Sequence, residues 1–137
     1  MIFVDSSAWI ALLDQGDGHH SRAMDFQRVL KGGAHGRLIT TDYVLDESIT
    51  YLRLTAGVEQ ARSFRQIVQA SESVQVVWTT PELFWASWEA LISRPDKRWS
   101  LTDCLSFKTM ENLDIHTAFA FDNDFRQAGF NLLPGPT

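Results

Sequence analysis

The sequence predicts an α/β fold in which a largely parallel sheet of about four to five strands carries helices on both faces. Short apolar runs suited to buried strands alternate with longer segments of helical periodicity along the whole chain. Two helical segments stand between most successive strands, which is enough chain for the crossover that parallel strands require. With 137 residues, 45% of them hydrophobic, the chain has enough apolar material for one domain core.

The strands are predicted by short runs of apolar and β-branched residues. The first run, Ile2-Phe3-Val4, suits a buried strand and ends abruptly at the acid Asp5. The last run is brief and precedes Pro134. We therefore expect strands over residues 2–4, 38–41, 74–78 and 116–121, and a last short strand that ends at residue 133.

Helices are predicted where apolar residues recur every three to four positions. Their ends carry the usual signals, since Pro81 stands at the first position of one helix and Gly57 follows the end of another. Ser6 or Ser7 is expected to cap the first helix. We expect helices over residues 8–13, 19–31, 43–55, 58–71, 82–93 and 101–113, with one helical turn within 125–130.

The chain shows no repeat, low-complexity segment or linker that would mark a second domain. We therefore expect a single domain over residues 1–133 and a loose C-terminal tail over 134–137. No apolar stretch approaches the roughly 18 residues needed to cross a bilayer, and the N-terminus lacks the basic region of a signal peptide. Cys104 stands alone, so it predicts a small core residue rather than a disulfide. These features predict a cytoplasmic protein without a membrane partner.

The segment from Trp99 to Phe107 has the pattern of the first two turns of a helix, and it carries an acid, Asp103, in its first turn. Ser100 is a suitable N-cap, and Asp103 stands three residues later, at the capping-box position. Two interpretations are open for this segment alone. Asp103 is either a helix cap and nothing more, or an acid that also serves a functional cleft.

Three further acids favour the cleft. Asp5 and Asp122 each follow a predicted strand, and open α/β sheets bind ligands at the carboxyl ends of their strands. Glu47 lies beside the apolar stripe of the helix after the second strand, whereas Asp46 should point further toward solvent. Taken singly, each acid has an ordinary explanation as a turn residue, a cap or a solvated charge.

Carboxylates that meet in one cleft repel one another unless cations or protons compensate. Oxygen ligands without histidine or cysteine suit Mg²⁺ or Mn²⁺ rather than Zn²⁺. Such an ion can provide a water as the nucleophile on a phosphodiester and can neutralise charge on the phosphoryl oxygens. The net charge of −5 therefore does not exclude nucleic acid, because bound ions would add positive charge locally.

The one compact basic cluster, Arg94, Lys97 and Arg98, leads directly into Trp99. These residues suit an RNA backbone with a base stacked on the Trp99 ring. The alternative is a solvated loop with Trp99 as a core anchor. The aromatic residues of helix 82–93 similarly indicate either ordinary core or a surface for a dimer or partner.

Four segments together resemble the PIN domain and, more narrowly, the VapC-type toxin ribonucleases of type II toxin–antitoxin systems. The resemblance covers nearly the whole chain, in the right order. Its most specific parts are the segment around Asp103 and the segment that runs from Asp122 to Phe130. The segments are Val4-Asp5-Ser6-Ser7, Val44-Leu45-Asp46-Glu47, Ser100-Leu101-Thr102-Asp103-Cys104-Leu105-Ser106-Phe107 and Phe121-Asp122-Asn123-Asp124-Phe125-Arg126-Gln127-Ala128-Gly129-Phe130.

The resemblance implies a PIN-like three-layer sandwich and a Mg²⁺- or Mn²⁺-dependent endoribonuclease that acts as a toxin. It implies that Asp5, Glu47, Asp103 and Asp122 form an acidic quartet that binds the metal. Asp124 would support this quartet from outside the direct ligands. It also implies a homodimer, an RNA substrate and a cognate antitoxin. A PIN-like module that binds RNA or protein without catalysis, and an RNA-processing nuclease that is not a toxin, are the alternatives.

Within this reading, Asp5, Asp103 and Asp122 would hold a first metal, and Glu47 would complete that site or a second one. Smaller polar residues would orient ligands or bound water, namely Thr102 together with Ser6 or Ser7. The chain departs from the family pattern at two positions, with Asn123 where a basic residue is common and Ala120 where Thr is common. Neither departure removes a carboxylate.

Overall fold

A computed structural model describes residues 1–136 of the chain. Its sheet has five strands in the spatial order β3-β2-β1-β4-β5, and every neighbouring pair is parallel. The predicted α/β fold and the order of its strands and helices are therefore confirmed. The strands are β1 (Ile2–Val4), β2 (Leu38–Thr41), β3 (Val74–Val77), β4 (Thr117–Phe119) and β5 (Asn131–Leu133).

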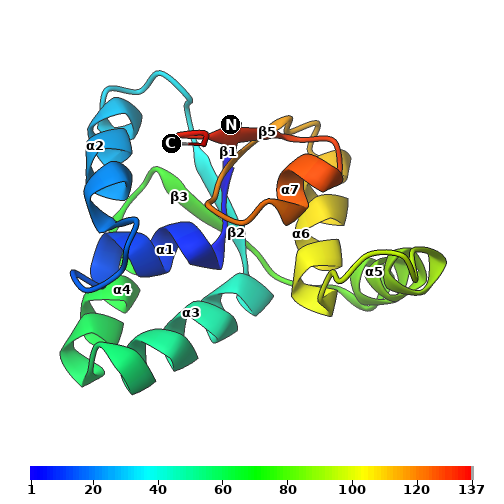
Figure 1. The fold of residues 1–137 in the computed structure, drawn as a ribbon, viewed down its shortest axis with the longest axis horizontal. Helices are drawn as coiled ribbons and strands as arrows, with labels where there is room; N and C mark the ends of the chain where they lie inside the picture. Colours follow the sequence, from blue (N-terminus) through cyan, green and yellow to red (C-terminus); the bar gives the residue numbers. More distant parts are fainter. Residues whose placement is uncertain (137) are drawn as a thin grey trace.

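Seven helices cover the sheet: α1 (Ser6–Leu13), α2 (His20–Lys31), α3 (Asp42–Thr55), α4 (Val58–Ala70), α5 (Pro81–Ser93), α6 (Leu101–Asn112) and α7 (Asp124–Gln127). In Figure 1, α1, α2 and α4 lie on one side of the sheet and α5, α6 and α7 on the other. Helix α3 contacts α1 and α4 and also reaches α6. The predicted three-layer arrangement is confirmed. Within residues 1–136, no helix combines the length and the apolar character needed to cross a membrane.

The core joins the sheet to α6 and α7. Phe3 of β1 lies 6.0 Å, between ring centres, from Phe125 of α7, which in turn lies 5.1 Å from Phe107 of α6. Cys104 of α6 is fully buried, as predicted. Because these contacts fix both helices against the strands, the acids at the helix starts are held at the edge of the sheet.

Helix α1 begins earlier than expected because its N-cap is Asp5. The Asp5 carboxylate accepts the backbone N–H of Ser7 at 3.2 Å and the Ser7 hydroxyl at 2.7 Å. Ser6 and Ser7 are thus the first helical residues, and the prediction that one of them caps the helix is wrong. An aspartate satisfies the orphan N–H groups of a first turn as well as a serine does.

The C-terminal end of the chain turns back toward α2. Strand β4 stops at Phe119, earlier than expected, because the N–H of Phe121 donates to the Ser7 hydroxyl at 3.0 Å. After β5, the carbonyl of Gly135 accepts a hydrogen bond from Arg22 of α2. Thr137 lies outside the described residues, so the loose tail remains a prediction there. The domain boundary at residue 133 remains a prediction as well.

Candidate metal centre

Acidic side chains gather where β1 and β4 end. These strands are parallel neighbours, so their carboxyl ends share one edge of the sheet. Asp5 directly follows β1, and Asp122 follows β4 after a short turn. Asp103 lies in the first turn of α6, and Asp124 begins α7. The predicted convergence of acids from distant parts of the chain is present.

Three of these carboxylates form a compact group. Asp103, Asp122 and Asp124 each offer an oxygen, and these oxygens all lie within 4.8 Å of one another. The Asp122 carboxylate also accepts the backbone N–H of Asp124 at 3.0 Å, which fixes its orientation. The donor set consists of oxygen atoms alone, the ligands that Mg²⁺ and Mn²⁺ prefer. The residues present therefore fit a hard divalent cation.

Asp103 has two roles in this geometry. Its backbone N–H donates to the Ser100 hydroxyl at 3.0 Å, and its Oδ2 accepts the Ser100 N–H at 3.0 Å. The predicted capping box is therefore confirmed. Capping engages one carboxylate oxygen and leaves the other free for the acidic group, so the two interpretations of this residue are compatible.

Glu47 reaches the site from α3. Its Oε1 accepts a hydrogen bond from the hydroxyl of Ser6, at the start of α1. Its charge also acts on Asp5 and Asp103 by repulsion. Asp46, one residue earlier, is exposed like Glu47, but within residues 1–136 its side chain accepts no hydrogen bond from the site. The choice of Glu47 over Asp46 as the acid of this helix that faces the site is therefore consistent with its contacts.

Burial and mutual repulsion dominate the electrostatics of the site. Burial, with smaller contributions from Asp103 and Glu47, raises the pKa of Asp5 to about 7, although hydrogen bonds from Ser7 oppose the rise. Burial, followed by repulsion from Asp122 and Asp103, raises the pKa of Asp124 to about 7. Burial also raises the pKa of Asp103. A bound cation would favour the ionised form of each group.

The compact group differs in membership from the one we expected. It contains Asp124, which we expected to support the ligands from outside. Asp5 is not a member of this group, and two hydrogen bonds from Ser7 hold its carboxylate. Ser6 and Ser7 contact the acids directly, whereas the Thr102 hydroxyl forms no hydrogen bond within residues 1–136. Which of these residues bind a metal stays a prediction.

The basic cluster before α6 does not leave all of its members free to contact RNA. Arg94 forms an ion pair with Asp96 at 3.0 Å, and its guanidinium carbon lies 5.4 Å from the centre of the Trp99 ring. Trp99 packs edge-on against Phe107 at 5.1 Å and is half-buried against the core. This geometry supports Trp99 as a core anchor. An RNA contact for Lys97 and Arg98 remains a prediction.

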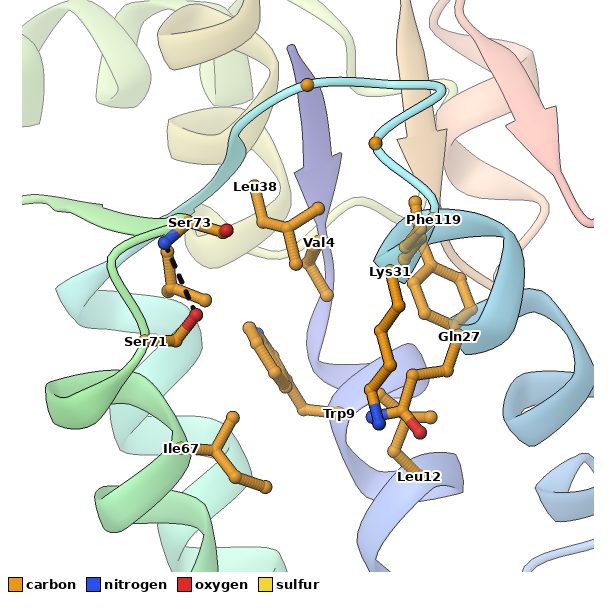
Figure 2. A pocket seen from close by; sticks show the side chains of 14 residues that line it. Val4, Trp9, Leu12, Gln27, Lys31, Leu38, Ile67, Ser71, Ser73 and Phe119 are labelled. Carbon is orange, nitrogen blue, oxygen red and sulfur yellow. Dashed lines mark hydrogen bonds between the residues drawn. The ribbon is translucent and has the colours of Figure 1, made fainter.

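A cavity of about 290 Å³ lies elsewhere, between α1, α2 and α4. Figure 2 shows Trp9 of α1, Lys31 of α2 and Ile67 of α4 around it. Its walls are mostly apolar and include no acidic side chain. The cavity is therefore separate from the acidic site.

The model of the PIN domain family matches residues 2–131. The chain belongs to the PIN domain family. This PIN domain is 35% identical over 130 residues, or 95% of each chain, to the 23S rRNA-specific endonuclease VapC20 of Mycobacterium tuberculosis, in each of two strains. It also resembles the crystal structure of M. tuberculosis VapC20, described as a sarcin-ricin loop cleaving toxin. That match has a TM-score of 0.85 and 35% identity, and it covers 95% of this chain and 96% of the other.

Sequence reasoning missed a hollow beside the acids of this PIN domain. Both positions that depart from the family pattern, Ala120 and Asn123, lie on its wall. Arg22 and Arg126 also line it, although they are far apart in the sequence. In the sequence these two positions were noted only as departures from the family pattern, and no sequence signal linked them to Arg22.

Proposed function

We propose that this PIN domain is a metal-dependent endoribonuclease and the toxin of a toxin–antitoxin pair. The observation that carries the proposal is the group of Asp103, Asp122 and Asp124, whose oxygens lie within 4.8 Å of one another. Asp5 and Glu47 add two carboxylates beside it. The 35% identity to a 23S rRNA-specific endonuclease supports the same conclusion.

In this proposal, Asp103, Asp122 and Asp124 hold Mg²⁺ or Mn²⁺, and Asp5 and Glu47 complete that site or a second one. The ion supplies an activated water and neutralises charge on the phosphoryl oxygens. The chain positions its acids through short local bonds: Ser100 holds Asp103, Ser7 holds Asp5 and Ser6 holds Glu47. In-line attack by water on the phosphodiester would leave a 5′-phosphate on the product.

Ribosomal RNA is the first substrate class to test. The related VapC20 is described as specific for 23S rRNA and as cleaving the sarcin-ricin loop. We therefore propose an RNA of this class as substrate, with Lys97 and Arg98 as contacts to its backbone. A toxin with this substrate acts in the cytoplasm and is silenced by a cognate antitoxin.

The test is cleavage of a sarcin-ricin hairpin RNA with Mn²⁺ by the wild-type chain and by the D5N and D103N variants. We expect each variant to lose more than about a hundredfold in rate, because even outer partners of metal ligands cost about 10–100-fold. Asp46→Asn is the matched control, since Asp46 is exposed and adjacent to Glu47. Cleavage unchanged in both D5N and D103N would contradict the assignment.

Two measurements separate the alternatives. A binding module without catalysis would take up no Mn²⁺ in a calorimetric titration at millimolar metal, whereas the nuclease binds it. An RNA-processing enzyme would not arrest growth when its expression is induced. A toxin would arrest growth, and co-expression of a small neighbouring gene product would relieve the arrest.

We also propose that the protein forms a homodimer through α5. Three large apolar side chains on this helix are exposed: Trp85 by 60%, Ile92 by 55% and Trp88 by 40%. Clustered exposed aromatic residues are typical of protein interfaces rather than of free surface. In Figure 1, α5 is the outermost element on its side of the sheet, where a second copy has access to it.

A further inference from the structure

A hollow of about 250 Å³ adjoins the acidic site. Phe121 and Asn123 line the hollow and flank Asp122 in the sequence, so one of its walls belongs to the segment that carries this acid. The other walls come from the start of α2, from α7 and from the chain after β5. The residues that matter below are His19, Arg22, Phe121, Asn123 and Arg126.

Two arginines give the hollow positive charge. Within residues 1–136, neither Arg22 nor Arg126 forms an ion pair, although Asp122 and Asp124 are close to Arg126 in the sequence. Arg22 donates a hydrogen bond to the carbonyl of Gly135, which orients its guanidinium without cancelling its charge. Both side chains line the hollow and leave their charge available to an anion there.

The hollow also carries a stacked pair of rings. The imidazole of His19 lies 4.4 Å from the ring of Phe121, and the two planes are within 4° of parallel. The guanidinium carbon of Arg22 lies 5.4 Å from the centre of the same Phe121 ring. His19 is exposed, so the pair offers a ring face to a ligand. Nucleic-acid bases stack on such faces with little regard to base identity.

We propose that this hollow binds one nucleotide of the RNA next to the scissile phosphate. A backbone phosphate lies between Arg22 and Arg126, and its base stacks on His19. The inference rests on the proposed nuclease function and adds the subsite that holds the strand. An acidic peptide would use the two arginines but not the stacked rings, so the combination favours a nucleotide.

The charge of the protein explains why such a subsite is needed. The chain has a net charge of −5 and concentrates carboxylates where the RNA must approach. Phosphate contacts from arginine supply most of the attraction between proteins and nucleic acids. Two arginines that form no ion pair within residues 1–136 give the strand positive charge to bind next to the segment that carries the acids. The hollow is small, so it suits a single nucleotide rather than a longer stretch of strand.

The first test uses steady-state cleavage of the sarcin-ricin hairpin RNA with Mn²⁺. We expect R126Q and R22Q each to raise KM about tenfold with little change in kcat, and to lower the salt dependence of RNA binding by about one phosphate contact. R22Q retains an amide that can donate to Gly135, and thermal melting checks its fold. Arg65→Gln on α4 is the matched control, since among the described residues Arg65 bonds only to Gln69 of its own helix. Unchanged KM and salt dependence in R22Q and R126Q would overturn the proposal and indicate another occupant, such as an acidic peptide.

The second test needs no catalysis. AMP is titrated into the chain in EDTA while the ring protons of His19 are followed by NMR. We expect them to shift in the wild type, to shift less with inorganic phosphate and not to shift in R126Q, while His116 stays constant. No shift of His19 at millimolar AMP would overturn the subsite. If the wild type cleaves no RNA, the nuclease proposal fails, yet this titration still decides whether the hollow binds a nucleotide.

Discussion

The hydroxyl of Ser7 donates to the carboxylate of Asp5 across 2.7 Å, and the same oxygen accepts the N–H of Phe121 at 3.0 Å. One small side chain thus ties the end of β1 to the segment that carries Asp122. The relative position of two candidate metal ligands therefore depends on a residue that carries no charge.

Replacing this serine should separate the two acids. We expect Ser7→Ala to destabilise the protein by about 1–3 kcal/mol, because buried donors and acceptors lose their partner. We also expect it to weaken Mn²⁺ binding by about 10–100-fold, as outer partners of metal ligands do. Calorimetric titration and denaturant unfolding measure both effects. Ser93→Ala is the control, since Ser93 is exposed and its hydroxyl, within residues 1–136, bonds only to a carbonyl of its own helix. Equal Mn²⁺ affinity in the two variants would count against this role of Ser7.

The two roles of Asp103 can be separated by substitution. An asparagine retains the side-chain oxygen that accepts the Ser100 N–H, but it removes the charge. In EDTA, we expect Asp103→Asn to melt no lower than the wild type, because repulsion within the acidic group is relieved. With millimolar Mn²⁺, we expect the wild type to gain several degrees in Tm and the variant to gain none. Ser100→Ala should do the reverse, lowering stability by about 1 kcal/mol through the lost cap while keeping the response to Mn²⁺.

The stability of the metal-free protein should fall as pH rises. The pKa of Asp5 is raised by burial from 3.8 to about 7, so folding favours its neutral form. Its favourable contribution is complete below pH 4 and is lost as pH rises through 7, by at most ~4 kcal/mol. Urea unfolding in EDTA at pH 5 and pH 8 measures the loss, and D5N should show a smaller one. The same slope in D5N and the wild type would exclude Asp5 as its source.

The exposed face of α5 predicts the oligomeric state. We expect the wild type to be a dimer by light scattering after size exclusion, and Trp85→Ser with Trp88→Ser to be a monomer that remains folded. Trp78→Ser is the control, since this side chain is 67% exposed but lies outside the helix, just after β3. A monomeric wild type, or a dimer that survives the double substitution, would contradict the proposed interface.

The fold was predictable because its signals are local. The apolar run from Ile2 to Val4 and the helical spacing of the longer segments determine their elements without reference to the rest of the chain. One error is local, since Asp5 rather than Ser6 or Ser7 caps α1, and another lies where a distant partner decides. Strand β4 ends early because the N–H of Phe121 bonds to Ser7, which is 114 residues away in the sequence. No pattern around residue 121 shows that bond.

The candidate site was predictable in part. The positions of Asp5 and Asp122 after parallel strands bring both acids to one edge, and residue type alone indicates the chemistry. Which carboxylates come close depends on local turns, such as the one in which Asp122 accepts the N–H of Asp124. The hollow with Arg22 and Arg126 depends on how the chain after β5 packs against α2, which residue types do not reveal.

The complete burial of Cys104 has a practical consequence. Its neighbour Asp103 is both the cap of α6 and a member of the acidic group, and burial raises the pKa of the Cys104 thiol to about 11. A thiol reagent can therefore modify this protein only when the beginning of α6 opens. Because a bound ion would hold Asp103 in place, its arrival should slow the reaction. The rate of thiol modification at Cys104 thus reports how often the metal centre opens, and its measurement needs no RNA.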